Sequence, residues 1–126
     1  MKRAILIVED SSTMRSLIAS TLEEMEDFDI TEVASGFEAL KALPGKPFDL
    51  IITDINMPDI NGLELVSFVK KHPSYKETPL MIVTTEKGAE DRKRGMSLGA
   101  DTYLTKPFDA EELQTAVTRL LEKKQA

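Results

Sequence analysis

Short apolar runs without polar alternation recur along the chain at residues 4–8, 50–53 and 79–84. A run of this kind is typical of a strand that is buried on both faces, as in parallel sheets. A half-polar run at 29–33 indicates a strand at the edge of the sheet. Together with a short segment at 102–105, these runs predict five strands.

The segments between the strands carry the apolar spacing or the boundary residues of helices. After cap candidates at 11–13, apolar residues recur in one stripe at Met14, Leu17, Ile18, Leu22 and Met25. A capping-box pattern at 35–38 starts a second helix, which ends at Pro44 and Gly45. A third helix carries Leu63, Val66 and Val69 inward and ends at His72 and Pro73, and a fourth covers residues 86–98 and ends at Gly99. A fifth helix is capped by Asp109 and buries Leu113, Val117, Leu120 and Leu121.

Strands and helices therefore alternate through the chain as five βα units. Connections of a few residues and right-handed crossovers predict an α/β fold, with a parallel sheet covered by helices on both faces. The sequence contains no internal repeat, low-complexity segment or linker. We expect one domain that covers residues 1–126.

Composition narrows the class of protein. The 126 residues are 41% hydrophobic and 30% charged, which is ordinary for a globular domain with one core. The absence of cysteine excludes a disulfide framework and a thiolate metal site. The net charge of −6 and the scattered lysines argue against nucleic-acid binding.

Residues 1–8 are basic and then apolar, which superficially resembles a signal peptide. The apolar run ends before Glu9, so it is too short for a signal sequence or a membrane span. We therefore expect a cytoplasmic protein without a membrane segment. We also expect a monomer.

Ionisable or hydroxyl side chains stand at the ends of four predicted strands: Glu9 and Asp10 after the first, Asp54 after the third, Thr84 at the end of the fourth, and Lys106 after the fifth. In open α/β sheets, ligands bind outside the carboxyl ends of the strands. Three carboxylates gathered there repel one another unless a cation compensates, and their oxygens suit Mg²⁺. A hydroxyl and an ammonium opposite them suit a phosphoryl group, so the pattern predicts transfer of a phosphoryl group to a carboxylate.

Each of these residues also has a purely structural interpretation. Glu9 and Asp10 can cap the following helix, Thr84 can be a satisfied hydroxyl, and Lys106 can be a solvated lysine. Their joint occurrence at the ends of separate strands favours the functional interpretation.

Longer stretches around these residues resemble the response-regulator receiver domains, and most closely their stand-alone chemotaxis members. The matching stretches follow one another in order at 7–15, 53–58, 61–65, 84–86 and 99–108. The resemblance implies a flavodoxin-like (βα)5 fold with the strand order 2-1-3-4-5. It also implies a single-domain response regulator that a sensor histidine kinase phosphorylates, which makes the protein a signalling switch and not an enzyme.

The resemblance assigns roles to the acidic residues. Asp54 would accept the phosphoryl group. Glu9, Asp10, Asp54 and the backbone carbonyl of Asn56 would hold Mg²⁺, and Mn²⁺ would be the alternative cation. Asp10 would be a direct ligand, whereas Glu9, where many members carry aspartate, reaches far enough to bind the metal through a water.

It also implies how the signal leaves the pocket. Thr84 would bond the phosphoryl group and move towards it, and Lys106 would neutralise it. Tyr103 would be the switch aromatic, with a ring that alternates between an exposed and a buried position. The peptide bond between Lys106 and Pro107 is expected to be cis.

Two further positions match members that lose the phosphoryl group quickly. Asn56 and Glu86 lie two residues past the phosphoacceptor and two past Thr84. They would flank the path of the hydrolytic water, and we expect them to tune dephosphorylation.

The predicted fourth helix is expected to be loosely held. Ala89 and Met96 are nearly its only inward apolar residues, and Gly95 costs about 1 kcal/mol relative to alanine. The face formed by this helix, the fifth strand and the fifth helix is therefore expected to bind an output protein, with Arg92 and Tyr103 near its centre. The identity of that protein stays open.

Other classes of protein match the pattern less well. Phosphatases that form an aspartyl-phosphate carry the motif Asp-x-Asp after their first strand, whereas Asp54 of this chain follows the third predicted strand. A flavodoxin-like FMN carrier would bind phosphate at 11–13, but Glu9 and Asp10 repel phosphate and the chain has no tryptophan for flavin stacking. A receiver-like binding module that works without phosphorylation is the remaining alternative. The single histidine, His72, is expected at the surface.

Overall fold

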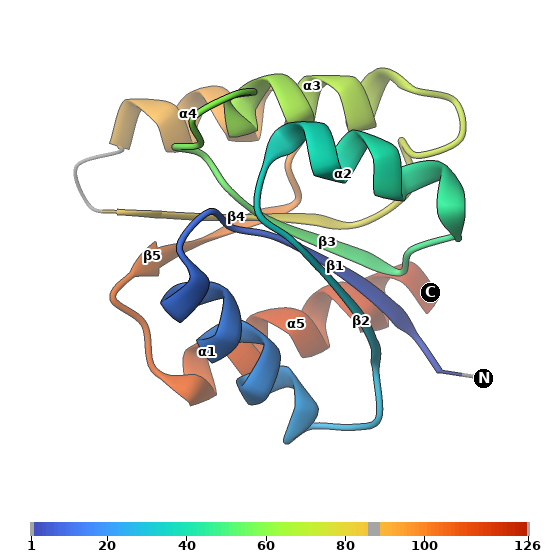
Figure 1. Ribbon diagram of the computed structural model, residues 1–126, viewed down its shortest axis with the longest axis vertical. Coiled ribbons are helices and arrows are strands. Elements are labelled where there is room, and N and C mark those ends of the chain that lie inside the picture. The colour runs from blue at the N-terminus through green and yellow to red at the C-terminus, as the bar shows by residue number, and fades with distance from the viewer. Residues whose placement is uncertain (1, 86–88, 126) are drawn as a thin grey trace.

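The computed structural model describes residues 2–85 and 89–125. Its elements are β1 (Ala4–Val8), α1 (Ser12–Glu23), β2 (Asp29–Val33), α2 (Gly36–Ala42), the short 3-10 helix η1 (Leu43–Gly45), β3 (Leu50–Asp54), α3 (Gly62–Lys71), β4 (Leu80–Thr85), α4 (Ala89–Ser97), β5 (Thr102–Lys106) and α5 (Ala110–Gln125). The strands form one sheet, with α2, α3 and α4 on one face and α1 and α5 on the other (Figure 1).

The strand order is β2-β1-β3-β4-β5, and every neighbouring pair is parallel. This confirms the predicted α/β class and the flavodoxin-like order. The predicted bounds of the strands are nearly correct. β4 begins and ends one residue later than expected, at Leu80 and Thr85, and β3 and β5 each end one residue later, at Asp54 and Lys106. The predicted start of the fourth helix at residue 86 lies outside the described residues.

The register of the sheet aligns the ends of its central strands. Val8 at the end of β1 pairs with Thr53, and Asp54 at the end of β3 pairs with Val83. Because the strands are parallel, the carboxyl ends of β1, β3, β4 and β5 lie at one edge of the sheet.

Side chains on the two faces of the sheet enter two separate hydrophobic clusters, because successive residues of a strand point to opposite faces. Leu6 and Val8 pack on the side of α2 and α3, whereas Ile5 and Ile7 pack on the side of α1 and α5. All five residues of β1 are buried, as expected for a central parallel strand. The core thus holds β1 and β3 rigidly beneath the acidic residues that follow them.

The apolar stripe of α1 is narrower than its sequence predicted. Ile18 and Leu22 are buried and Met14 is half-buried, but Leu17 is 47% exposed. Each residue turns the helix by about 100°, so a residue next to a buried position can leave the interface altogether.

The inward face of α4 was predicted wrongly. Ala89 and Met96 are exposed, and Gly95 is the buried residue of this helix among those described. A Cβ atom at position 95 would overlap with the δ-methyl group of Ile82 on β4 and would lie 3.5 Å from Leu63. Glycine therefore allows α4 to approach the sheet closely, a contact that apolar spacing in the sequence does not reveal.

His72 is less exposed than predicted. It is half-buried, and its ring stacks on Tyr75 with the ring centroids 4.5 Å apart. The ring of Phe68 lies 5.4 Å away, so the three rings form one aromatic group at the end of α3.

Gly62 fixes the start of α3 against the end of β3. Its amide donates a hydrogen bond to the Ile55 carbonyl at 2.8 Å, and Asn61 caps the helix through its side-chain oxygen, which accepts from the Leu63 amide at 2.8 Å. A Cβ atom at position 62 would overlap with the Asp54 carbonyl oxygen and with the backbone of Ile55. The close approach of these two backbones therefore requires glycine.

We predict that Gly62→Ala lowers the free energy of unfolding by about 2–4 kcal/mol, because neither backbone can yield without displacing the core. Gly45→Ala is the matched control, since a Cβ atom there meets no atom within 4 Å. The control should stay within about 0.5 kcal/mol of the wild type. Chemical denaturation followed by circular dichroism measures both values, and equal stabilities of the two variants would contradict the close-approach argument.

Candidate functional site

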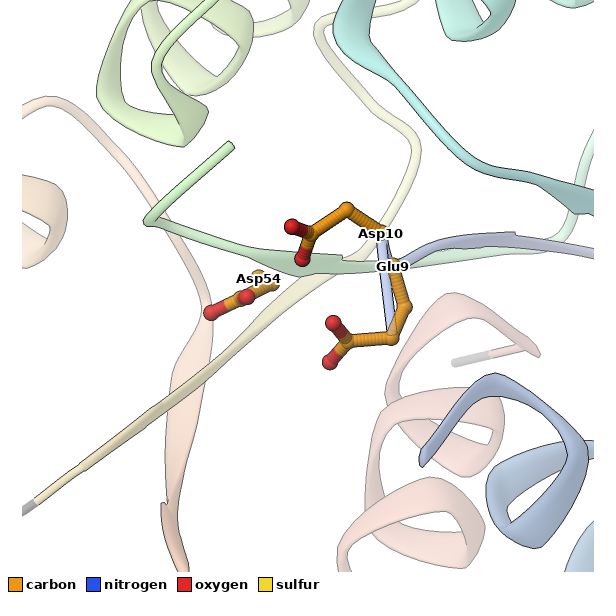
Figure 2. A group of neighbouring side chains, drawn as sticks. All are labelled: Glu9, Asp10 and Asp54. Carbon is orange, nitrogen blue, oxygen red and sulfur yellow. The ribbon is translucent and has the colours of Figure 1, made fainter. Parts of the chain in front are cut away.

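Three carboxylates meet at the edge of the sheet where the strands end. Glu9 and Asp10 follow β1, and Asp54 ends β3; one carboxylate oxygen of each lies within 4.8 Å of one from each of the others. Figure 2 shows the three side chains directed towards a shared space. Glu9 and Asp54 are buried, whereas Asp10 is exposed. The predicted acidic cluster is therefore present in the structure.

Protein partners surround the carboxylate of Glu9. Its Oε1 accepts a hydrogen bond from the Lys106 ammonium at 2.9 Å, and its Oε2 accepts one from the Ser11 amide at 3.1 Å. Burial raises the pKa of the Glu9 carboxyl above its ordinary value of 4.5, and the hydrogen bond from Lys106 opposes that shift. Both oxygens of Glu9 are thus engaged by the chain itself.

Asp54 is held less completely. Its Oδ1 accepts a hydrogen bond from the Ile55 amide at 2.8 Å, while its Oδ2 lies 3.6 Å from the Lys106 ammonium. Lys106 therefore stands between Glu9 and Asp54 and faces both. Lys106, which the sequence places at the end of the fifth strand, therefore reaches the acidic cluster as predicted.

The hydroxyl of Thr84 has no hydrogen-bond partner, although the residue is only 1% exposed. Leaving a buried hydroxyl unpaired costs free energy, so native structures rarely retain one without a reason. Thr84 directly follows Val83, the partner of Asp54 in the sheet. Its free donor is therefore available to an acceptor bound beside Asp54.

The charges at this edge do not balance within the cluster. The single positive charge of Lys106 offsets one of the three carboxylates, which leaves an excess of negative charge. Carboxylate and carbonyl oxygens are the ligands that Mg²⁺ prefers, and it binds sites with one or two carboxylates and several waters. The donor set at this edge therefore fits a hard divalent cation.

Sequence reasoning missed Arg15 of α1 as a support of this edge. Its guanidinium donates a hydrogen bond to the Glu9 carbonyl at 2.8 Å and lies 3.7 Å from the Glu32 carboxylate. It thereby ties the first turns of α1 to the end of β1. An arginine one and a half turns after an acid pair is the sequence signal that was available.

The loop that follows Asp54 is anchored to α2. The Asp59 carboxylate accepts hydrogen bonds from the Gly36 amide at 3.2 Å and the Phe37 amide at 3.0 Å, at the amino end of that helix. The bond from Phe37 is the largest cause that holds the pKa of Asp59 below its ordinary value of 3.8. The segment between β3 and α3 is therefore fixed at Asp59 as well as at Gly62.

Three other predicted residues are not among the three clustered carboxylates. Asn56 is exposed in the loop after β3, and Tyr103 lies on β5 with a ring that is partly exposed. The peptide bond between Lys106 and Pro107 is cis, the isomer that the resemblance implied. Glu86 lies outside the described residues.

None of the described helices is long and apolar enough to cross a membrane. The short apolar runs seen in the sequence are instead the strands of the sheet.

Comparison with known proteins gives one consistent result. A family model for the response regulator receiver domain matches residues 5–118. The chain is 37% identical over 118 residues to a chemotaxis protein CheY homolog of Campylobacter jejuni, covering 93% of this chain and 91% of that protein. It is 38% identical over 111 residues to the chemotaxis protein CheY1 of Helicobacter pylori, covering 87% of this chain and 90% of that protein.

A solved structure supports the same relationship. The chemotaxis response regulator CheY4 of Vibrio cholerae superimposes with a TM-score of 0.87 at 35% identity, over 95% of this chain and 99% of that one. Receiver domains serve two-component signalling, histidine kinases phosphorylate them, and they are signalling proteins and not conventional enzymes. The acidic triad of Glu9, Asp10 and Asp54 is typical of their Mg²⁺ site. Fold, site and sequence together show that this chain belongs to the response-regulator receiver domain family.

Proposed function

We propose that this chain is a single-domain response regulator, with one receiver domain over residues 1–126, in a two-component pathway of the chemotaxis type. A sensor histidine kinase transfers a phosphoryl group to Asp54. The observation that carries the proposal is the buried, unpaired hydroxyl of Thr84 beside an acidic cluster that Lys106 only partly neutralises. The names of the relatives supply the chemotaxis setting.

Asp54 acts as the nucleophile in this proposal. A carboxylate oxygen attacks the phosphorus of the kinase phosphohistidine, a P–O bond forms, and the P–N bond breaks so that the imidazole leaves with the electron pair and takes up a proton. Lys106, whose ammonium lies 3.6 Å from Asp54, counters the charge of the incoming phosphoryl group. The Thr84 hydroxyl then donates to one of its oxygens.

Asp10, Asp54 and the backbone carbonyl of Asn56 would hold Mg²⁺, or Mn²⁺, directly. Glu9 would act through a water, because Lys106 and Ser11 already engage both of its carboxylate oxygens. The cation would supply the positive charge that lets a phosphoryl group approach three carboxylates.

The output of the switch is proposed to leave through the surface formed by α4, β5 and α5. A hydrogen bond to the phosphoryl group draws Thr84 towards Asp54 and opens space for the ring of Tyr103. Tyr103 is exposed on β5, and Arg92 of α4 lies over its ring. The ring is therefore placed to report the state of the pocket to a partner protein on this surface.

We predict that acetyl phosphate adds one phosphoryl group to the protein in the presence of Mg²⁺, detected by intact-mass spectrometry. Asp54→Asn should remove the label, and a chelator should prevent its formation, because both abolish part of the acceptor site. Asp27→Asn is the matched control and should be labelled normally, since Asp27 is an exposed acid that pairs with Lys2. Equal labelling of Asp54→Asn and the wild type would refute the assignment of Asp54, whereas an unlabelled wild type would favour a binding module that works without phosphorylation.

We predict that the phosphoryl group is lost within seconds to minutes and that Asn56→Lys slows the loss severalfold. A lysine at the exposed position 56 would obstruct the approach of the hydrolytic water. Ser74→Lys adds the same charge at an exposed position between α3 and β4, at the opposite edge of the sheet, and should leave the rate unchanged.

The decay of the labelled protein after removal of the donor measures this lifetime. Glu86→Leu should also slow the decay, because the second position has the same proposed role. Unchanged rates in both variants would show that these side chains do not control water access.

We predict that beryllofluoride with Mg²⁺, a mimic of the phosphoryl group, shifts amide NMR resonances in α4, β5 and the start of α5 as well as around Asp54. The physical reason is that movement of Thr84 and Tyr103 repacks β5 against α4. Asp54→Asn with the same additions serves as the control. Shifts confined to the neighbourhood of Asp54 would place the output surface elsewhere.

A further inference from the structure

Arg92 of α4 contacts two residues of β5 at once. Its guanidinium carbon lies 5.0 Å from the centroid of the Tyr103 ring, and its Nη1 donates a hydrogen bond to the Thr105 hydroxyl at 3.1 Å. Tyr103 and Thr105 are two residues apart, so both side chains stand on the same face of the strand. A single arginine therefore bridges α4 to both of them.

The rest of α4 offers little that would hold it to β5. Gly95 is its buried residue among those described, and it faces Ile82 of β4. The exposed side chain of Met96 lines, with Arg92 and Tyr103, a hollow of about 360 Å³ on the α4 side of the ring. Arg92 is thus a principal side-chain connection between this helix and the last strand.

Hollows border the Tyr103 ring on its α5 side as well as on its α4 side. Tyr103 is 44% exposed, and a second hollow of about 420 Å³ lies on its α5 side, lined among others by Ala116 and Arg119. Among the described residues, the Arg92 guanidinium lies directly over this exposed ring. A cation over an aromatic face is favourable even at an exposed site.

The hydrogen bond to Thr105 links this contact to the acidic pocket. Thr105 immediately precedes Lys106, and it is the register partner of Thr84 in the sheet. Any displacement of Thr84 towards Asp54 therefore takes place beside the strand position that Arg92 holds.

We propose that Arg92 is a positioning residue that holds the Tyr103 ring in its exposed position while Asp54 is unmodified, and that this contact breaks when the ring turns inward. The inference rests on the proposed function, because it needs a signal that arrives from Asp54. It adds a residue of α4 that opposes the switch, so the protein responds to the phosphoryl group less readily than it would without the arginine.

Removing the contact shifts the balance towards the inward ring. Loss of one exposed cation–π contact and one hydrogen bond changes the ratio of the two positions by about tenfold. Because coupling between two sites is reciprocal, a ligand that favours the inward ring then binds more tightly, by up to the same factor.

Tyr103 can report on its own position. The chain has two tyrosines and no tryptophan, so Tyr75→Phe leaves Tyr103 as the single source of tyrosine fluorescence. In this background, acrylamide quenching of Tyr103 is measured during a titration with beryllofluoride at saturating Mg²⁺. Quenching should fall as the ring becomes buried, and the midpoint of that change gives the apparent affinity for the mimic.

Arg92→Gln should move this midpoint to a concentration about tenfold lower. Arg92→Lys keeps a cation near the ring but lacks the planar guanidinium that also bonds Thr105. Its midpoint should therefore lie between those of the background and of Arg92→Gln. Arg94→Gln is the matched control, since it removes the same side chain from an exposed position of α4 that does not line the hollow beside Tyr103, and its midpoint should equal that of the background.

The outcomes separate this inference from the proposed function. If the background responds and Arg92→Gln has the same or a higher midpoint, Arg92 does not hold the ring and the proposed function stands. A drop of the midpoint in Arg94→Gln equal to that in Arg92→Gln would also overturn the inference, because the effect would then come from net charge. If no protein responds, the background included, the proposed coupling of Asp54 to Tyr103 fails and the role of Arg92 fails with it.

Discussion

The parallel register of the sheet forces three carboxylates to share one edge with a single lysine. Lys106 donates to the buried carboxylate of Glu9 and lies 3.6 Å from Asp54, while Asp10 remains exposed. Glu9 is therefore satisfied by the protein, and the remaining negative charge is concentrated on the other two acids. A site with this imbalance favours a divalent cation, and the cation in turn makes an anionic phosphoryl group acceptable. The unpaired hydroxyl of Thr84 completes the set, since it offers a donor that no protein atom uses.

The position of Asp54 depends on the backbone that follows it. Gly62 brings the start of α3 so close to the end of β3 that no Cβ atom fits between them. Asp59 anchors the same loop to the amino end of α2 through two backbone amides. These contacts anchor the loop at two points, so the carboxylate of Asp54 is presented by a rigid support. Preorganisation of this kind spares a bound group the cost of ordering the loop.

The surface of α4 and β5 is held differently. Gly95 lets α4 approach Ile82 of β4 closely. Arg92 bridges α4 to Tyr103 and Thr105 of β5. A helix with few buried side chains belongs to the less stable part of a fold, where conformational change is least costly. The rigid acidic pocket and this weakly held surface are joined by β4 and β5, which pair at Thr84 and Thr105.

The sequence alone was sufficient for the architecture and for the acidic cluster, because continuous apolar runs mark buried parallel strands and chain direction places the residues after them at one edge. The strand order and the roles proposed for Asp54, Thr84 and Lys106 came from resemblance to a family. Tertiary structure decided what no local pattern encodes. It showed that Gly95 and not Met96 faces the sheet, that Leu17 leaves the core, and that Arg15, Asp59 and Arg92 make their contacts with other elements. These contacts join residues far apart in the chain or depend on the rotation of a helix about its axis, and packing of the whole fold sets both.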